Sequence, residues 1–509
     1  MAPRLALPLA AIARRPGRAL AGALLLLTVL CLALIKPPVA LADEPAPSSG
    51  LSATQRQLVL VVRFADDASE KLNEPYTTTD KYRTQWEYCL DSLLNRDASA
   101  ENAHLSSPSL RTYLEKVSGG RLVVASEAPQ TNVADGTVRY ITLPRRMSEY
   151  QSSEQALSDA VAEFNRLYPS YDASALSRDG RFIDSVMLMV ETGGNTPKFG
   201  DPFWPHQSNA GGSGLAIGAG AKAREVGALV TLPSSHRTPY TTIHEFIHTL
   251  GAKDLYRAGT DESGEVKVTG VPVGTWDIMG GAVSSGYRLQ RPLAITRQDV
   301  GWEDLSFATA GTHTLYAPLD GEPQSASRPQ ALAFKTPLSD SEYFVVEFRK
   351  KAVDYSSVGI SGSYQGSLDG DIGGSGLIVY RVNPAQKAYG NRDTGRDYAY
   401  IFRPGETTGR EGPRGDGAGD VTNAQLSASG RTSLGTADMT KGLADGAITY
   451  SDGQNSGLVV RVKSQADDSI SFEVAYPDYD AAGVWMPATS ADGSCPLPAA
   501  GVLSARTAS

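Results

Sequence analysis

The residues with the clearest chemical potential in this chain share one short pattern, HExxHxxGxxD. On a helix, side chains four residues apart lie on one face, so the imidazoles of His244 and His248 can converge on a metal ion with Glu245 beside them. If the chain turns sharply at Gly251, a residue type that tolerates left-handed backbone, Asp254 can reach the same metal. Three protein ligands leave a fourth position open for water, which is the arrangement of a catalytic zinc site.

A helix with a purely structural role is the alternative interpretation of this pattern. Thr242 stands three residues before Glu245, a capping-box spacing that would give Glu245 a structural task. However, Thr238-Pro239 offers an earlier helix start, an N-cap followed by proline at the first helical position. Histidine is also scarce, with six in 509 residues, and the surrounding residues are apolar, so unpaired imidazoles would be buried at a cost. The pattern therefore favours a metal site.

The motif, with aspartate as third ligand, resembles that of the metzincin-type zinc peptidases, and the surrounding sequence is similar to the immune inhibitor A family of secreted bacterial metallopeptidases. The similarity spans roughly residues 58 to 475. Residues 381–383 depart from it, because the family often has His-x-Asp there and this chain has Arg-Val-Asn. The matching stretches are 59–64, 109–122, 204–206, 254–256, 274–279, 301–302, 342–349 and 375–382.

The resemblance implies roles for further residues around the zinc. Met279 matches the methionine of a tight turn that forms an apolar floor beneath the metal, although a methionine is more often core filling. Tyr256 and Tyr287 are both candidates for a phenol that donates a hydrogen bond to the developing oxyanion. His206 is a candidate ligand or substrate contact, with packing in its loop as the favoured alternative. Residues 226–232 would form an edge strand that pairs with an extended substrate.

Two classes of function fit these residues. The first is a secreted endopeptidase with one catalytic Zn²⁺, in which Glu245 takes a proton from the attacking water and passes it to the leaving amine of a protein or peptide substrate. The second is an extracellular binding or adhesion protein with a structural or vestigial zinc domain. The intact Glu245 favours the first class, because a vestigial site has no reason to keep the general base.

The first 42 residues predict export from the cell. Four arginines precede residue 19, residues 19–35 are an apolar run, and Ala40-Leu41-Ala42 fits the A-x-A cleavage signal. An uncleaved membrane anchor is the alternative, although the run is at the short end of what spans a bilayer. We therefore expect a secreted protein without a stable membrane anchor.

The composition of the processed chain excludes some partners. Removing residues 1–42 takes away five basic residues and leaves 42 basic against 56 acidic, a net charge of about −14. This acidic balance argues against nucleic acid as a partner and against anionic membranes. Cys89 and Cys495 remain and could form one disulfide in an oxidising compartment.

Residues 43–310 predict an α+β catalytic domain in which a mixed sheet supports the active-site helix. After a polar linker at 43–56, strand and helix patterns alternate, and residues 195–220, rich in Gly, Pro and Ser, predict a long loop. The expected strands are 58–64, 121–125, 182–190 and 226–232, and the expected helices before the zinc helix are 86–94, 109–117 and 152–168.

Beyond residue 311 the pattern becomes that of a β-sandwich, with short strands separated by Gly, Asp and Ser turns up to residue 478. Two of these turns are acidic and could hold Ca²⁺ outside the cell, with plain solvated turns as an equal alternative. The candidate calcium ligands are Asp369, Asp371, Asp416 and Asp420. Residues 479–509 predict a disordered tail.

Overall fold

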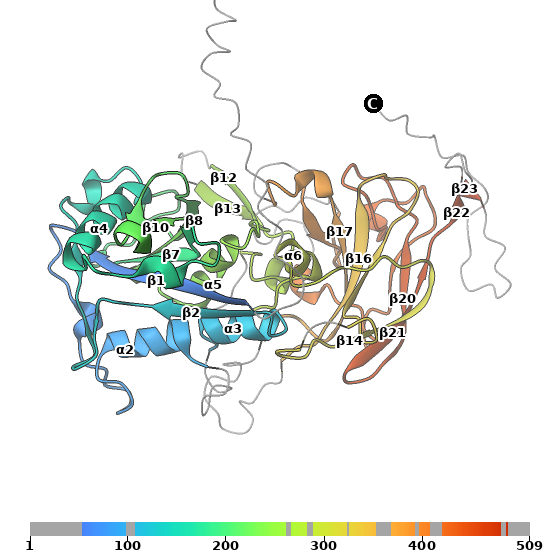
Figure 1. Ribbon diagram of the computed structural model, residues 1–509. Helices are drawn as coiled ribbons and strands as arrows, with labels where there is room; N and C mark the ends of the chain where they lie inside the picture. The colour runs from blue at the N-terminus through green and yellow to red at the C-terminus, as the bar shows by residue number, and fades with distance from the viewer. Residues whose placement is uncertain are drawn as a thin grey trace, which may run out of the picture. The chain divides into compact units, whose positions relative to one another are not determined.

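The computed structural model describes residues 53–97, 107–260, 266–281, 289–322, 325–352, 368–391, 396–407, 420–479 and 485–486. The predicted export segment, Tyr287, Asp416, Cys495 and most of the predicted tail lie outside these ranges. Within the described ranges, no helix has both the length and the hydropathy needed to cross a membrane. The fold is a mixture of helices and several sheets (Figure 1), as the predicted α+β class requires at that level.

The first half of the chain is built on a six-stranded mixed sheet with the order β2-β1-β7-β11-β8, to which β5 adds by pairing with β1. All of its pairings are parallel except the one between β8 and β11. Its central strands are continuous apolar runs, because a parallel sheet with both faces covered buries every side chain. The strands are β1 (Ala53–Arg63), β2 (Leu122–Glu127), β5 (Ile141–Thr142), β7 (Ser185–Val190), β8 (His206–Asn209) and β11 (Ala228–Pro233).

Helices cover both faces of this sheet. In Figure 1, α2 (Gln85–Cys89) and α3 (Leu110–Val117) lie below β1 and β2, and α4 (Ser153–Leu167) lies on the other side. Successive side chains of β1 point to opposite faces and so enter two different cores. Val59 and Val61 pack in the cluster that contains α3 side chains, and Leu60 packs in the cluster that contains α4 side chains. A turn of π-helix, Leu90–Asn95, continues α2.

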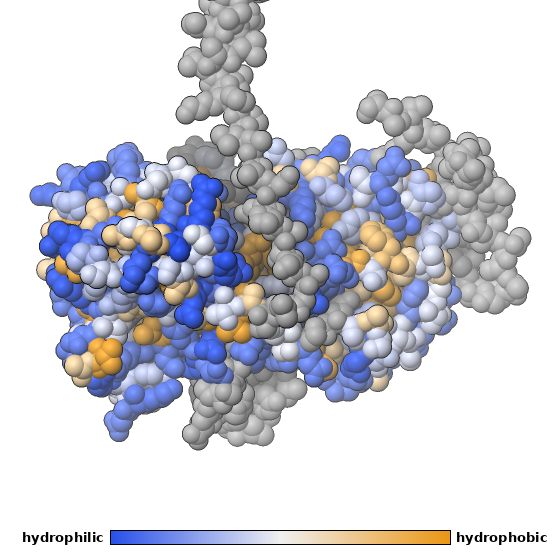
Figure 2. Space-filling model, in the orientation of Figure 1, coloured by the Kyte–Doolittle hydropathy of each residue, from blue (hydrophilic) through white to orange (hydrophobic). Residues whose placement is uncertain are grey.

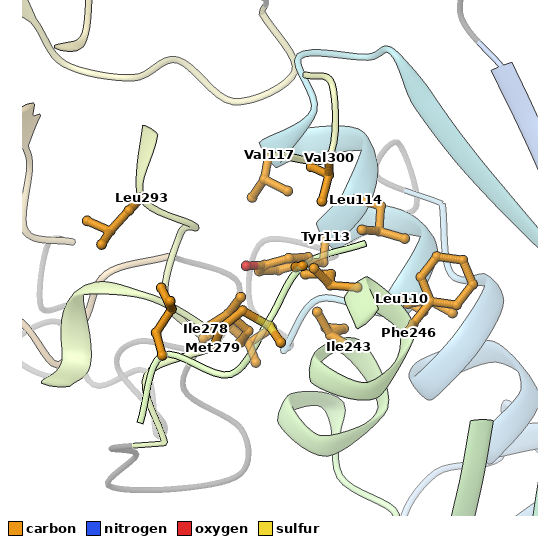
Figure 3. Packing of buried hydrophobic residues seen from close by; sticks show 14 of the residues in the cluster. Leu110, Tyr113, Leu114, Val117, Ile243, Phe246, Ile278, Met279, Leu293 and Val300 are labelled. Atoms are coloured by element: carbon orange, nitrogen blue, oxygen red, sulfur yellow. The ribbon is translucent and has the colours of Figure 1, made fainter. Parts of the chain in front are cut away.

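The helix that carries the zinc motif, α5 (Pro239–His248), packs in the same core as α3. Figure 3 shows Ile243 and Phe246 of α5 beside Leu110 of α3, with Ile278 and Met279 close by. All of these residues are fully buried. The apolar face of α5 therefore fixes its orientation, and its opposite face carries the histidines.

The second half of the chain contains two four-stranded antiparallel sheets that share one apolar core. Phe344 and Phe348 from one sheet pack with Val460 and Phe472 from the other. The first sheet has the order β15 (Ala331–Phe334), β16 (Tyr343–Arg349), β17 (Gly376–Val382), β18 (Ala399–Ile401), and the second β14 (Gly311–Tyr316), β21 (Ser469–Ala475), β20 (Val459–Gln465), β19 (Ser433–Gly435).

The two halves also share a core. One apolar cluster contains Met279 and Leu293 together with Val345, Ile378 and Ala399, which lie on the other side of residue 310. The elements not yet named are short: β3 (Thr131–Asn132), β4 (Thr137–Val138), β6 (Phe182–Ile183), β9 (Ala216–Ile217), β10 (Arg224–Val226), β12 (Arg257–Thr260), β13 (Val266–Gly270), α6 (Ala294–Asp299), β22 (Asp478–Tyr479) and β23 (Trp485–Met486).

Two predictions about the first half are wrong in detail. The expected strand 182–190 is broken at Asp184 into β6 and β7, and the expected loop 195–220 contains the strands β8 and β9. Polar residues dominate β8, so its pairing with β11 is what makes it a strand. On the face shown in Figure 2, hydrophilic residues are interspersed with smaller apolar patches in the region of α4.

Candidate metal centre

The start of α5 is set by its first residues. The side chain of Thr238 accepts a hydrogen bond from the backbone N–H of Thr241, and Pro239 occupies the first turn, as the sequence predicts. The helix ends at His248, and the chain then turns at Gly251, whose φ of 103° is a conformation that favours glycine. This turn brings Asp254 back under the helix.

The structure brings three predicted ligands together. His244 Nε2 lies 3.1 Å from Asp254 Oδ1, and His248 Nε2 lies 3.3 Å from the same oxygen. The candidate ligand atoms of the three residues all lie within 4.8 Å of one another. A tetrahedral ion with bonds of about 2.0–2.1 Å separates its ligand atoms by roughly 3.3 Å, so the spacing suits zinc.

The ring orientation of both histidines is fixed by backbone carbonyls. His244 Nδ1 lies 3.0 Å from the carbonyl oxygen of Ile278, and His248 Nδ1 lies 2.8 Å from that of Ala252. A carbonyl oxygen only accepts, so each Nδ1 carries the hydrogen and a neutral ring has its lone pair on Nε2. Two such lone pairs face the carboxylate of Asp254, an arrangement that a shared cation satisfies.

Burial and charge shape the acid–base properties of these groups. Burial alone would lower the pKa of His244, but Asp254 and Glu245 raise it to about 9. Burial would raise the pKa of Asp254, but the charges and hydrogen bonds of His248 and His244 hold it well below its usual range. For Glu245, burial raises the pKa against the opposing effect of the two histidines. The site therefore combines two carboxyl groups with two imidazoles in a setting shielded from water, where each pKa depends strongly on its charged neighbours.

Met279 lies in a turn that is hydrogen-bonded to the residue following Asp254. Its carbonyl accepts a hydrogen bond from the backbone N–H of Leu255, and its own N–H donates to the carboxylate of Asp277 at 2.7 Å. That carboxylate also accepts from the N–H of Leu293 and from the Thr296 hydroxyl, both at 2.7 Å, while burial raises its pKa to about 6. Met279 is fully buried, and its turn holds the segment that carries Asp254.

The three ligand candidates and Glu245 line one cavity of about 640 Å³. Tyr256 lies on its wall with its ring stacked at 6.2 Å from that of His244. Phe199 and Trp204 provide an apolar part of the wall, and Tyr389 lines it from the second half of the chain. A concave site with convergent polar groups is the usual form of a binding or catalytic site.

The remaining candidates have distinct environments. His206 lines the cavity, but both of its ring nitrogens have partners: Nδ1 faces the Trp204 carbonyl at 2.6 Å and Nε2 faces the Ser153 hydroxyl at 2.8 Å. These hydrogen bonds agree with a packing role, although His206 lies in β8 and not in a loop. Tyr287 lies outside the described residues, so Tyr256 is the candidate phenol that the structure locates in the cavity.

The predicted edge strand is wrong. Within the predicted strand 226–232, residues 229–231 pair with β7 on one side and with β8 on the other, so β11 is an inner strand. The edge of the sheet nearest the cavity is β8, two of whose residues, His206 and Gln207, line the cavity. Because β8 is polar, its sequence shows no apolar strand pattern, and the strand was not predicted.

The candidate calcium ligands in the described residues have other partners. The carboxylate of Asp369 accepts hydrogen bonds from the Arg349 guanidinium and from the Arg291 backbone N–H. Asp420 caps a short helical turn by accepting from Asn423. Asp371 accepts a hydrogen bond at its backbone carbonyl from Thr275. In the described ranges, the only group of three acidic, His or Cys side chains spaced for a metal is that of His244, His248 and Asp254.

Two features near the centre were missed at the sequence level. Tyr240 precedes His244 by one helical turn, and its ring lies 5.6 Å from the imidazole. Burial, with the charges of Asp254 and Glu245, raises the pKa of its phenol. The four-residue spacing on α5 could have identified it. Tyr389 carries no such signal, because it comes from a turn far along the chain.

Comparison with known proteins adds no assignment. The chain matches no family model, and no curated protein has a significantly similar sequence.

Proposed function

We propose that this chain is a secreted zinc-dependent endopeptidase with a metzincin-like catalytic fold, of the kind that its resemblance to the immune inhibitor A family implies. The observation that carries the proposal is the convergence of His244, His248 and Asp254 within one cavity that Glu245 also lines. The export pattern of residues 1–42 supports action outside the cell. The β-rich second half would be a sandwich-like region attached to the catalytic fold.

The three ligand residues would hold the zinc through His244 Nε2, His248 Nε2 and a carboxylate oxygen of Asp254. When bound, zinc supplies a Lewis acid that polarises a peptide carbonyl and makes water a nucleophile at neutral pH. The carbonyls of Ile278 and Ala252 keep the two imidazoles in the tautomer that this binding needs.

Glu245 would move the proton in this reaction. It stands next to His244 on α5 and lines the cavity, so its carboxylate can accept the proton of the attacking water and return it to the leaving amine. Tyr256, on the same wall, would donate its phenolic hydrogen to the oxygen of the carbonyl under attack. Loss of the general base should therefore leave the ligands intact and remove turnover.

The substrate would bind as an extended peptide along β8. This strand is the edge of the sheet beside the cavity, and an edge strand is where an extended peptide can add to a sheet. The acidic composition and the absence of a basic surface pattern in the sequence argue for protein rather than nucleic acid as substrate.

The test is hydrolysis of casein by purified residues 43–509, with and without a zinc chelator, beside the Glu245→Gln variant. We expect one zinc per chain in both proteins and a loss of turnover in the variant of at least about 100-fold. Glu473→Gln, on β21, serves as a control with the same chemical change away from the cavity. Cleavage that survives chelation, or a Glu245→Gln variant with full activity, would contradict the proposal. Bound zinc without cleavage of any substrate would favour the binding-protein alternative.

A further inference from the structure

The segment that carries Asp254 has no regular secondary structure of its own. Residues 251–256 lie between the end of α5 and the start of β12, so the backbone of this segment depends on partners elsewhere. One of them is the turn at Met279, which accepts the N–H of Leu255. The others come from the second half of the chain.

Asn391 holds this segment from the opposite side. Its backbone N–H donates to the carbonyl oxygen of Asp254 at 2.9 Å, and its side-chain Nδ2 donates to that of Leu255, also at 2.9 Å. The same Nδ2 donates to the carbonyl of Ala399 at 2.8 Å, while Oδ1 accepts from the Ala399 N–H at 3.1 Å. Asn391 is 1% exposed, so each of these bonds is shielded from water. Its side-chain amide thus ties β18 to Leu255, the residue that follows the third proposed ligand.

The neighbouring residue shows how closely the two segments approach. Gly390 has a φ of 64°, and a Cβ placed on it would lie 2.3 Å from the carbonyl oxygen of Asp254 and 2.8 Å from Lys253 Cβ. A side chain at this position would push the segments apart. The contact therefore needs glycine both for its backbone conformation and for its lack of a side chain.

A second link lies beside the first. Arg257, at the start of β12, donates from Nε and Nη2 to the carboxylate of Asp397, which is 1% exposed. Paired donors on one buried carboxylate restrict both position and orientation. Residues 254–257 are therefore held at one end by Asn391 and at the other by Asp397.

From these contacts we infer that Asn391 is a positioning residue for the metal centre, which is complete only when the region around β17 and β18 is docked against it. The inference rests on the proposed metal-binding role of Asp254. A ligand on an irregular segment must be held within about 0.5 Å of its place by surrounding groups, and Asn391 supplies two of the hydrogen bonds that do so. Zinc affinity in this chain then depends on a side chain that touches no ligand side chain.

The experiment compares Asn391→Ala with Asn455→Ala in residues 43–509. Asn455 is a matched control, because it is also buried, donates from Nδ2 to two carbonyls, those of Thr436 and Asp438, and accepts from the N–H of Gly457. Both substitutions remove the same kind of buried amide, but only Asn391 contacts the ligand segment. The readouts are the Zn²⁺ dissociation constant by chelator competition, the visible absorption spectrum of the Co²⁺ form, and the thermal unfolding temperature.

We expect both variants to unfold at a lower temperature than the parent chain. Asn391→Ala should in addition raise the Zn²⁺ dissociation constant at least about tenfold, as loss of a supporting partner does in metal sites, and should change the Co²⁺ spectrum. Asn455→Ala should keep the Zn²⁺ dissociation constant within about twofold of the parent's, well short of that tenfold effect. Its Co²⁺ spectrum should match that of the parent chain. Gly390→Ala keeps every hydrogen-bonding group and should weaken zinc binding as Asn391→Ala does. If Asn391→Ala shows no cooperative unfolding transition, the zinc affinity of Gly390→Ala is the result that tests the inference.

The failures can be told apart. Unchanged zinc affinity in Asn391→Ala and Gly390→Ala would overturn the inference and leave the proposed metal centre standing. Equal weakening in Asn455→Ala would overturn it too, because the effect would then be general loosening. A parent chain that binds no zinc would refute the proposed function, and with it the inference.

Discussion

His248 Nε2 lies 3.3 Å from Oδ1 of Asp254, across the turn that ends α5. This contact exists because Gly251 adopts a φ of 103° between the two residues. The other ring nitrogen of His248, Nδ1, donates a hydrogen bond to the Ala252 carbonyl within the same turn. The turn therefore fixes both the tautomer of one proposed ligand and the place of another, which ties the candidate metal centre to the end of one helix.

Replacement of His248 should remove the metal. In His248→Ala we expect zinc affinity to fall by more than about 100-fold, because the site loses a direct ligand rather than a supporting group. Zinc per chain, measured after dialysis by atomic absorption, should drop from one to near zero. His313→Ala is the control, since His313 lies on β14 and contacts the Thr309 carbonyl. Retained zinc in His248→Ala would refute the ligand assignment.

A chain that ends at residue 310 should not fold cooperatively. The core around Met279 includes Val345, Ile378 and Tyr380 from the second half, and each large apolar side chain of this kind contributes about 1.5–3 kcal/mol when buried. Losing several of them removes an amount comparable with the roughly 5–15 kcal/mol that stabilises a typical domain. Thermal unfolding of residues 43–310, followed by circular dichroism, should show no sharp transition, whereas residues 43–509 should. A cooperative, zinc-binding fragment would contradict this expectation.

The sequence predicted the parts of the site that follow from local spacing. His244 and His248 share a helix face, Thr238-Pro239 begins that helix, and Gly251 permits the turn to Asp254, all within one short stretch. The apolar runs of the central strands were also readable, because burial on both faces leaves a continuous pattern.

Other features of the fold and the site could not be predicted from the sequence, because they depend on contacts between residues far apart in the chain. The strand β8 has a polar sequence and is defined by its pairing with β11. Asn391 has no motif, and its role arises from contacts with Leu255 and Ala399 that only the folded chain creates. Asp369 was a candidate calcium ligand in a glycine-rich turn, with a plain solvated turn as the alternative, and the buried Arg349 that donates to its carboxylate lies on β16.

Tyr389 should contribute to substrate binding and not to stability. Tyr389 is 62% exposed and lines the cavity that contains the proposed metal ligands. If the ring packs on a bound peptide, an aromatic contact of about 1 kcal/mol gives roughly a fivefold rise in KM for Tyr389→Ala, with kcat little changed. Steady-state kinetics on a peptide substrate would measure this. Val133→Ala, an exposed apolar residue between β3 and β4, should leave KM as it is, and an unchanged KM in Tyr389→Ala would exclude the contact.

Glu406 should make the folded state less stable as pH rises. Burial raises the pKa of its carboxyl to about 7, against the opposing hydrogen bond from the Tyr400 hydroxyl. The unfolded chain releases this proton at a pH near 4.5, so between about pH 4.5 and 7 the folded state holds a proton that unfolding releases. The contribution of Glu406 to the free energy of unfolding is therefore full below pH 4.5 and is lost as pH rises to about 7. At roughly 1.4 kcal/mol per pKa unit, the loss is about 3 kcal/mol.

The variant Glu406→Gln isolates this effect, because an amide has the same shape and does not titrate. Its Oε1 can accept from the Arg403 N–H, and the Tyr400 hydroxyl can rotate to accept from Nε2, so both hydrogen bonds survive. Urea unfolding at several pH values should give equal stabilities near pH 4.5 and a variant more stable than the parent near pH 8. Tyr400→Phe, which removes the hydrogen bond that lowers the pKa of Glu406, should extend the parent's decline to higher pH. If the free energy of unfolding of Glu406→Gln falls between pH 4.5 and 7 as steeply as that of the parent, the buried carboxyl is not the cause of the decline.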